Sequence, residues 1–249
     1  MKQRMRKKLL GFTLIEMIVV IIILGVLAAG ISTFVSLSTQ IYTEATARDQ
    51  LVSSARFAIE RLNRDIRNSL PNSLRLTNLN RCLEFTPIIE STTYTNIPVA
   101  PEGNSNTINI IEFDETFGET SDINWSVVVY PLNPEDVYGS NDKVFGVSSI
   151  SPPNDERVIT LENSVQFSED SPTQRLYFIN INEPIEYCLI SGDLTRNNIL
   201  MAEDIVNTGP FEIQPATLQR NAMVQAHFRF EKNNEQVTFN NEIQVLNVP

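Results

Sequence analysis

The feature that most constrains this chain is an apolar run near its start that is long enough to cross a membrane. Met17 to Thr43 is 27 residues without a formal charge. Lys2, Arg4, Arg6, Lys7 and Lys8 precede it with no acid among them, and the segment Gly11-Phe12-Thr13-Leu14-Ile15-Glu16 joins the two parts. As a helix at about 1.5 Å per residue the run spans about 40 Å, which exceeds the ~30 Å hydrocarbon core of a bilayer. The sequence therefore predicts a membrane-spanning helix.

Glu16 lies at the edge of this run, where a carboxylate is costly. Insertion scales put the cost of a charged residue at a helix centre at roughly 2.5–3.5 kcal/mol. A short basic leader, then Gly-Phe-Thr-Leu-Ile-Glu and an apolar helix, resembles the type IV prepilins. The resemblance implies that a prepilin peptidase cleaves between Gly11 and Phe12 and that the new N-terminal Phe12 is N-methylated. It also implies a long N-terminal helix packed on a β-sheet head.

Glu16 is the residue with the clearest chemical role. Once the chain begins at Phe12, the new α-amine and the Glu16 carboxylate lie about one helical turn apart. They can pair within one subunit or with a neighbour along a filament, and a matched pair is far less costly in low dielectric than a lone charge. Such pairing would fix the axial register of a subunit during assembly. The alternative is a carboxylate that extends to the lipid headgroups.

A secretory signal peptide is the competing interpretation of the N-terminus. Its apolar core is normally 7–15 residues and ends in small residues, and Ala28-Ala29-Gly30 resembles such a site. The apolar run continues well past that point, which favours an anchor that is retained. Because the cations precede the run, the positive-inside rule places the N-terminus in the cytoplasm and the rest of the chain outside. We expect a single-pass inner-membrane protein with a periplasmic head.

The distribution of proline divides the chain. All 13 prolines lie at or beyond Pro71, so a single helix from Phe12 to Leu70 is predicted. We expect a leader at 1–11, a transmembrane or filament-core helix at 12–36, an amphipathic continuation at 37–70 and a β-rich head at 71–249. The continuation carries an apolar stripe and four ion pairs at four-residue spacing. The stripe is Val52, Ala55, Ile59, Leu62, Ile66 and Leu70; the pairs are Glu44/Arg48, Arg56/Glu60, Glu60/Arg64 and Arg61/Asp65.

From Pro71 onward, short β-branched and aromatic runs alternate with turn-forming residues, which indicates antiparallel sheet. The fold class is therefore α+β, with one head domain that contains one or two sheets packed on the helix. Lys232 to Glu235 reads as a hairpin tip, whereas Ser91–Asn106 and Pro131–Asp142 read as surface loops. The expected strands are Cys82–Ile89, Thr107–Phe113, Trp125–Tyr130, Arg157–Leu161, Arg175–Ile181, Ile185–Ile190, Val224–Phe230 and Gln236–Val245.

The two cysteines, Cys82 and Cys188, both lie in expected strands. An exported domain folds in an oxidising compartment, where disulfides form. In the chain-entropy account, a disulfide that closes the long loop between Cys82 and Cys188 stabilises the fold by about 4–5 kcal/mol. We expect a disulfide; the alternative is two buried free thiols.

Charge and composition argue against most enzymatic and nucleic-acid functions. Residues 71–249 carry 25 acids and 9 bases, a net charge of −16, which disfavours nucleic acid. The only histidine, His227, falls on the polar face of an expected strand, so it is a poor candidate for a catalytic base. The acids near Glu135, Asp136 and Asp142 lack the spacing of a calcium loop. We predict no enzymatic activity, no cofactor and no metal site.

Segments beyond the motif narrow the resemblance. Ile31–Phe34, Ala55–Leu62 and Asn68–Ser73 are similar to a group of minor pilins of the mannose-sensitive haemagglutinin (MSHA) type IV pilus. Tyr187-Cys188-Leu189 and Asp193–Arg196 resemble the same group and, more loosely, the J-type minor pseudopilins of type II secretion. The resemblance implies other minor and major pilins and an inner-membrane assembly platform as partners. Three functions stay open: a minor pilin, a pseudopilin, or a pilin-anchored adhesin or DNA-uptake tip, although the negative head argues against DNA.

Overall fold

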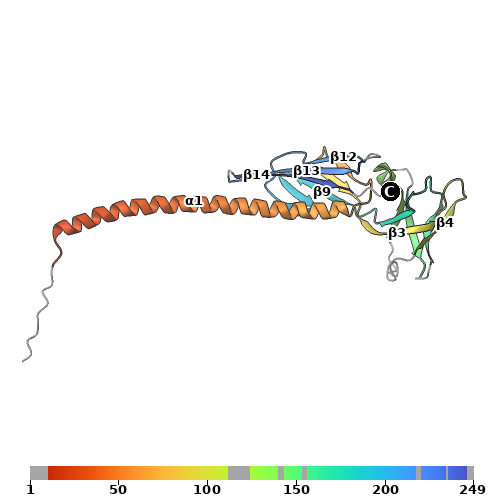
Figure 1. The fold of residues 1–249 in the computed structure, drawn as a ribbon, viewed down its shortest axis with the longest axis horizontal. Coiled ribbons are helices and arrows are strands. Elements are labelled where there is room, and N and C mark those ends of the chain that lie inside the picture. The colour runs from red at the N-terminus through yellow and green to blue at the C-terminus, as the bar shows by residue number, and fades with distance from the viewer. Residues whose placement is uncertain are drawn as a thin grey trace, which may run out of the picture. The chain divides into compact units, whose positions relative to one another are not determined.

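In the computed structural model, residues 11–111, 124–139, 143–152, 156–216, 220–233 and 235–245 are described. The chain divides between Asp49 and Gln50 into two compact units. One helix, α1 (Leu14–Arg67), runs through both (Figure 1). Antiparallel sheets follow it, so the architecture is α+β as the sequence predicts. The unit from Gln50 onward contains the last turns of α1, two open sheets and a barrel.

The helix ends at Arg67, three residues before the predicted end at Leu70. Beyond the helix, Leu70 donates its backbone N–H to Thr86 O at 2.8 Å. Asn68 receives the N–H of Ile88 on its backbone oxygen at 2.9 Å and returns a side-chain bond to Ile88 O at 3.1 Å. These bonds connect the end of the helix to the first strands of the head, so that the chain turns back onto the helix.

A five-stranded antiparallel sheet packs on the second part of α1. Its order is β1-β2-β9-β10-β11, and Leu83, Tyr187 and Leu194 are fully buried in the core that it shares with the helix. The strands are β1 (Arg75–Thr77), β2 (Cys82–Phe85), β9 (Ile185–Ile190), β10 (Asp193–Arg196) and β11 (Ile199–Ala202). The predicted strand Ile185–Ile190 is confirmed to the residue.

A three-stranded antiparallel sheet joins the same core. Its order is β12-β13-β14, with β12 at Phe211–Gln214, β13 at Met223–Lys232 and β14 at Glu235–Gln244. Alternation along β13 buries Ala226, Phe228 and Phe230 and exposes His227 and Arg229, as the sequence predicts. The hairpin tip falls between β13 and β14, although Asn234 lies outside the described residues.

Six further strands close into a barrel, which the sequence does not predict. The order around it is β3-β4-β7-β6-β5-β8. Figure 1 labels β3 and β4, which belong to this part of the structure. Its interior is apolar, because strand alternation directs residues such as Ile108, Val127 and Phe178 inward. The strands are β3 (Ile88–Asn96), β4 (Ser105–Ile111), β5 (Ser126–Val129), β6 (Val144–Ile150), β7 (Glu156–Val165) and β8 (Arg175–Ile179).

Two expectations about this region are wrong. Ser91–Asn106 is not all loop, because Ser91 to Asn96 belongs to β3 and pairs with both β8 and β4. The expected strand Cys82–Ile89 is two strands, since β2 ends at Phe85 and β3 begins at Ile88 on the far side of Pro87. Pro87 lacks the N–H that a continuous strand needs, which explains the break. Pro131–Asp142 contains a short helix, α2 (Glu135–Tyr138), and residues 140–142 lie outside the described residues.

Candidate functional site

The start of α1 is set by Thr13. Thr13 Oγ1 accepts the backbone N–H of Glu16 at 3.4 Å, and Thr13 O accepts that of Met17 at 3.3 Å. Thr13 is therefore the N-cap residue, and Thr13-Leu14-Ile15-Glu16 has the spacing of a capping box. Our sequence analysis assigned Thr13 no role, although the Thr-x-x-Glu spacing was the available signal. The helix thus begins immediately beyond the predicted cleavage point.

Glu16 lies in the first turn of α1, where the helix dipole stabilises a carboxylate. Phe12 is outside the helix and 76% exposed. In the uncleaved chain the nitrogen of Phe12 is an amide without charge, so the pairing predicted for the processed protein has no counterpart here. The roles of Gly11, Phe12 and Glu16 in cleavage, methylation and assembly stay predictions.

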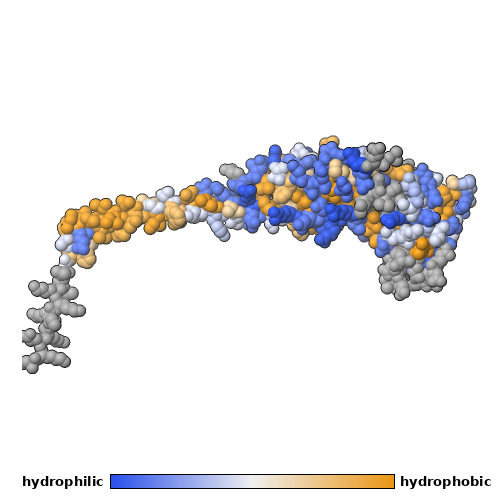
Figure 2. All heavy atoms as spheres, viewed as in Figure 1, coloured by the Kyte–Doolittle hydropathy of each residue, from blue (hydrophilic) through white to orange (hydrophobic). Residues whose placement is uncertain are grey.

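The segment after Glu16 is an exposed apolar helix. The large apolar side chains from Met17 to Tyr42 all lie on the surface, and Figure 2 shows hydrophobic residues along this part of α1. A helix that is hydrophobic all round requires lipid or neighbouring helices. Within α1 there is a stretch long and apolar enough to cross a membrane, judged by length and composition. The N-terminal helix therefore has the character of a single-pass anchor.

Comparison with known proteins agrees with this geometry. A family model described as the prokaryotic N-terminal methylation motif matches residues 6–32. No curated protein and no solved structure matches the chain. The chain thus carries the methylation motif of prokaryotic prepilin-like proteins at the start of a long apolar helix. This motif is typical of type IV pilin-like and pseudopilin subunits, which a prepilin peptidase processes.

A buried polar cluster fixes the second part of α1 to the five-stranded sheet. Asp65 is only 7% exposed, and its Oδ2 accepts a hydrogen bond from Tyr187 Oη at 2.8 Å. Arg196 Nε donates to the same oxygen at 2.6 Å, and Arg61 Nε lies 3.2 Å from Asp65 Oδ1. Burial, together with the bond to Asp65, raises the pKa of the Tyr187 phenol above its usual value. Four-residue spacing in the sequence pairs Asp65 with Arg61 alone, whereas Tyr187 and Arg196 reach Asp65 only through the fold.

The predicted disulfide is present and joins two neighbouring strands. Cys82 of β2 and Cys188 of β9 are direct register partners, and their sulfurs are bonded. Glu186 lies close to both sulfurs, so the three residues resemble a metal-ligand cluster by distance. Disulfide sulfurs are not thiolates, however, and the thiolate is the form that binds metal. The cluster is therefore a structural cross-link.

One of the acids considered for calcium, Asp136, has other partners in the structure. Asp136 is buried, its Oδ2 accepts the N–H of Leu132 at 2.8 Å, and Lys143 Nζ lies 3.3 Å away. A carboxylate held by a backbone amide and a lysine anchors its own loop. Asn141 and Asp142 lie outside the described residues. His227 is exposed, with Nδ1 3.0 Å from Asn240 Oδ1 on β14.

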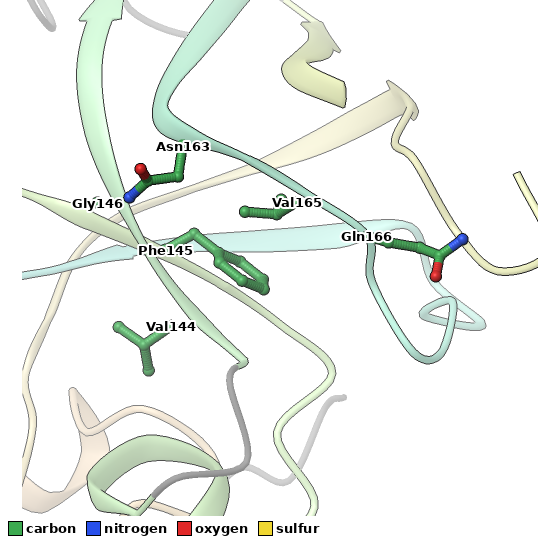
Figure 3. A pocket seen from close by; sticks show the side chains of 6 residues that line it. All are labelled: Val144, Phe145, Gly146, Asn163, Val165 and Gln166. Carbon is green, nitrogen blue, oxygen red and sulfur yellow. The ribbon is translucent and has the colours of Figure 1, made fainter. Parts of the chain in front are cut away.

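The barrel contains a cleft of about 430 Å³ between β6 and the end of β7 (Figure 3). The pairing between β6 and β7 begins at Val147 and Leu161. Phe145 on β6 and Val165 on β7 lie beyond this pairing and border a gap, which forms the cleft. Asn163 and Gln166 add amide groups to the lining. The ring of Phe145 packs edge-on against Phe167, with centroids 4.8 Å apart. The lining offers neutral hydrogen-bonding groups and one aromatic ring.

Proposed function

We propose that the chain is a minor pilin that takes part in the biogenesis of an MSHA-like type IV pilus and that it resembles the MSHA biogenesis protein MshO. The observation that carries the proposal is the methylation motif on an exposed apolar helix whose start holds Glu16. Such a helix can serve first as a membrane anchor and then as part of a filament core. The head of residues 71–249 would then project from the assembly and contact other subunits.

The proposal assigns each segment a task. Residues 1–11 are the leader removed by prepilin peptidase, 12–36 cross the inner membrane, 37–70 continue the helix, and 71–249 form the periplasmic head. The N-terminus lies in the cytoplasm before cleavage. Partners are the other minor and major pilins and the inner-membrane assembly platform. In this proposal the protein has no catalytic role.

A minor pseudopilin of type II secretion is the second candidate, because the same motif and helix would serve it equally. Tyr187-Cys188-Leu189, with the disulfide and the Asp65–Tyr187 bond, lies in the segment that resembles both groups. The neighbouring genes discriminate between the two, since pilus and secretion components are encoded with their partners. A pilus-tip adhesin would need a ligand site, for which the barrel cleft is one candidate among the described residues.

Substitution of Glu16 tests the proposed assembly role. Glu16→Val leaves the basic leader, Gly11 and the apolar run intact, so cleavage and membrane insertion should proceed. Incorporation into filaments or initiating complexes should fall by more than two decades, because breaking a buried pair costs about 3–5 kcal/mol. The readout is the ratio of processed subunit in sheared pili to that in the membrane.

Two matched variants separate charge compensation from helix capping. Glu16→Asp keeps the carboxylate and should retain part of the incorporation. Thr13→Val removes the cap at a cost of about 1 kcal/mol but keeps the charge. If Thr13→Val fails as completely as Glu16→Val, the defect comes from the helix start. If Glu16→Val assembles as well as the parent, pairing with the Phe12 amine is not its role.

A further inference from the structure

Strand β14, labelled in Figure 1, is an edge strand of the three-stranded sheet. It pairs with β13 along all ten residues without a shift in register. Among the described residues no strand pairs with its other side. Natural edge strands are usually protected by proline, lysine, a bulge or short length. Glu235–Gln244 contains neither proline nor lysine, and its pairing is regular.

The backbone groups on that open edge can be identified from the register. Val245 N–H donates to Ala222 O at 2.8 Å, which marks this pair as a hydrogen-bonded one. Because such pairs alternate in an antiparallel ladder, the amides of Ile243, Asn241 and every second residue before them also face β13. On the other side of β13, His227 N–H donates to Pro210 O, which agrees with this alternation. The residues whose N–H and C=O point to the open edge are Gln236, Thr238, Asn240, Glu242 and Gln244.

Arg67 of α1 borders β14, and Arg64 lies about one turn before it on the same helix. A cleft of about 400 Å³ is lined by Arg67 together with Met223, Glu242 and Gln244. A second cleft of about 440 Å³ is lined by Glu60, Asn63, Arg64 and Arg67. Asn241 Nδ2 donates to Asn63 Oδ1 at 2.7 Å, so β14 lies directly beside the helix.

These arginines are available to a partner. Arg64 and Arg67 are exposed, and neither forms an ion pair with a residue that the structure describes. Main-chain groups on an open edge supply affinity for an added strand, and side chains beside it supply selectivity. The two positive charges favour carboxylates on that strand.

We propose that an extended segment of a different pilin-like subunit, carrying carboxylates that face Arg64 and Arg67, adds to β14 as a fourth strand. The inference rests on the proposed function, because it requires that the chain assembles with such subunits. A second copy of this chain is a poorer occupant. Two heads of net charge −16 repel each other, and the partner needs acids only where its strand meets the arginines.

The test places a photo-crosslinking amino acid, p-benzoylphenylalanine, in the full chain in its native host. One position is Gln244, which has an outward amide and lines the cleft with Arg67. The matched control position is Glu212 on β12, which is exposed at the opposite edge of the same sheet. Cross-linked peptides are then identified by mass spectrometry.

Two sets of variants are combined with the crosslinker. Thr238→Pro removes one outward N–H and leaves the bonds to β13 intact, since proline is tolerated where an edge amide faces solvent. Thr238→Val keeps the N–H and is its control. The double variant Arg64→Gln/Arg67→Gln removes the two positive charges of α1 near β14. Non-reducing gels and thermal melts of the same variants show whether the head is folded.

We expect cross-links from position 244 to an acidic extended segment of another protein with a prepilin motif. Thr238→Pro should lower their yield about tenfold, and Thr238→Val should not change it. The double arginine variant should lower it about two- to thirtyfold, which corresponds to two exposed ion pairs. If the proline and valine variants give equal yields, or if the cross-linked partner is a second copy of this chain, the inference is wrong.

Failure of the inference can be told apart from failure of the proposed function. If the chain is processed and enters pilus fractions but position 244 yields no cross-link, only the strand-addition proposal fails. If the chain is neither processed nor found with any prepilin-like protein, the proposed function fails as well.

Discussion

Replacing Asp65 should loosen the head from the helix, because this carboxylate satisfies a hydroxyl that has no access to water. Tyr187 is 0% exposed, and Asp65 is the acceptor of its Oη–H. Leaving a buried donor without a partner costs about 1–3 kcal/mol. Arg196 also loses its carboxylate, but its side chain is 20% exposed and can be partly hydrated. Alanine is a better helix former than aspartate by about 0.5 kcal/mol. We therefore expect Asp65→Ala to lower the free energy of unfolding by about 1–3 kcal/mol.

The measurement is thermal unfolding of the full chain in detergent, followed by the fluorescence of the single tryptophan, Trp125, and by circular dichroism. For a unit of about 200 residues, each 1 kcal/mol shifts the melting temperature by about 2–4 °C, so a decrease of about 2–12 °C is expected. Trp125 lies in the barrel, against Phe178, whereas Asp65 is on the helix. Coincident shifts by both probes would show that the two regions unfold together.

Two controls locate the origin of the effect. Tyr187→Phe removes the hydroxyl itself and should cost only about 1 kcal/mol. Combined with Asp65→Ala, it should cost less than the sum of the two, because no unsatisfied donor is left behind. Arg61→Ala removes the most exposed member of the cluster and should cost under about 1 kcal/mol. The reasoning is refuted if Asp65→Ala shifts the melting temperature by less than 2 °C, or if the double variant is strictly additive.

Three further predictions concern processing, the disulfide and pH. The processed form should begin at N-methylated Phe12 in intact-mass measurements, and a chain beginning near Gly30 would contradict this. Replacing Cys82 and Cys188 together by alanine should lower stability by up to about 4–5 kcal/mol through loop closure; two free thiols in peptide maps of the exported protein would contradict the cross-link. Burial raises the pKa of Tyr138 to about 12 and raises that of Tyr187 as well. Unfolded tyrosine ionises near pH 10, so stability should stay level below about pH 10 and fall above it, by up to about 1.4 kcal/mol per pH unit per tyrosine. Tyr138→Phe should make that fall less steep, and an unchanged slope would contradict it.

The helix could be predicted from the sequence because its determinants are local. Three- and four-residue spacing of apolar residues and the absence of proline before Pro71 were sufficient. The centre of the buried stripe was misplaced, since Leu51 and Ala58 are buried whereas Val52 and Ile59 are only partly so. Ala58 is small and allows the sheet to approach closely, and apolar periodicity alone does not detect that.

The barrel could not be predicted because its closure depends on pairings between distant segments. β3 pairs with β8, more than 80 positions later, and no local pattern specifies that register. Ser91 to Asn96 is rich in threonine and serine, so it resembled a loop although threonine favours strands. The contacts of Tyr187 and Arg196 with Asp65 could not be predicted for the same reason, because each residue lies more than 120 positions from Asp65.

The negative charge of the head explains how a stable subunit can have an open edge at β14. A regular ten-residue edge without proline or lysine is an aggregation hazard in a free protein. Glu235 and Glu242 lie within that strand, and residues 71–249 carry a net charge of −16. Repulsion between like heads acts over about 8–10 Å at physiological salt, which is farther than the 4.8 Å strand spacing that pairing requires. Copies of this chain are thus kept apart before their edges can pair. A different subunit with fewer acids overall meets the two arginines of α1 without that barrier. The same charge that keeps like heads apart therefore favours a heterologous strand at the open edge of β14.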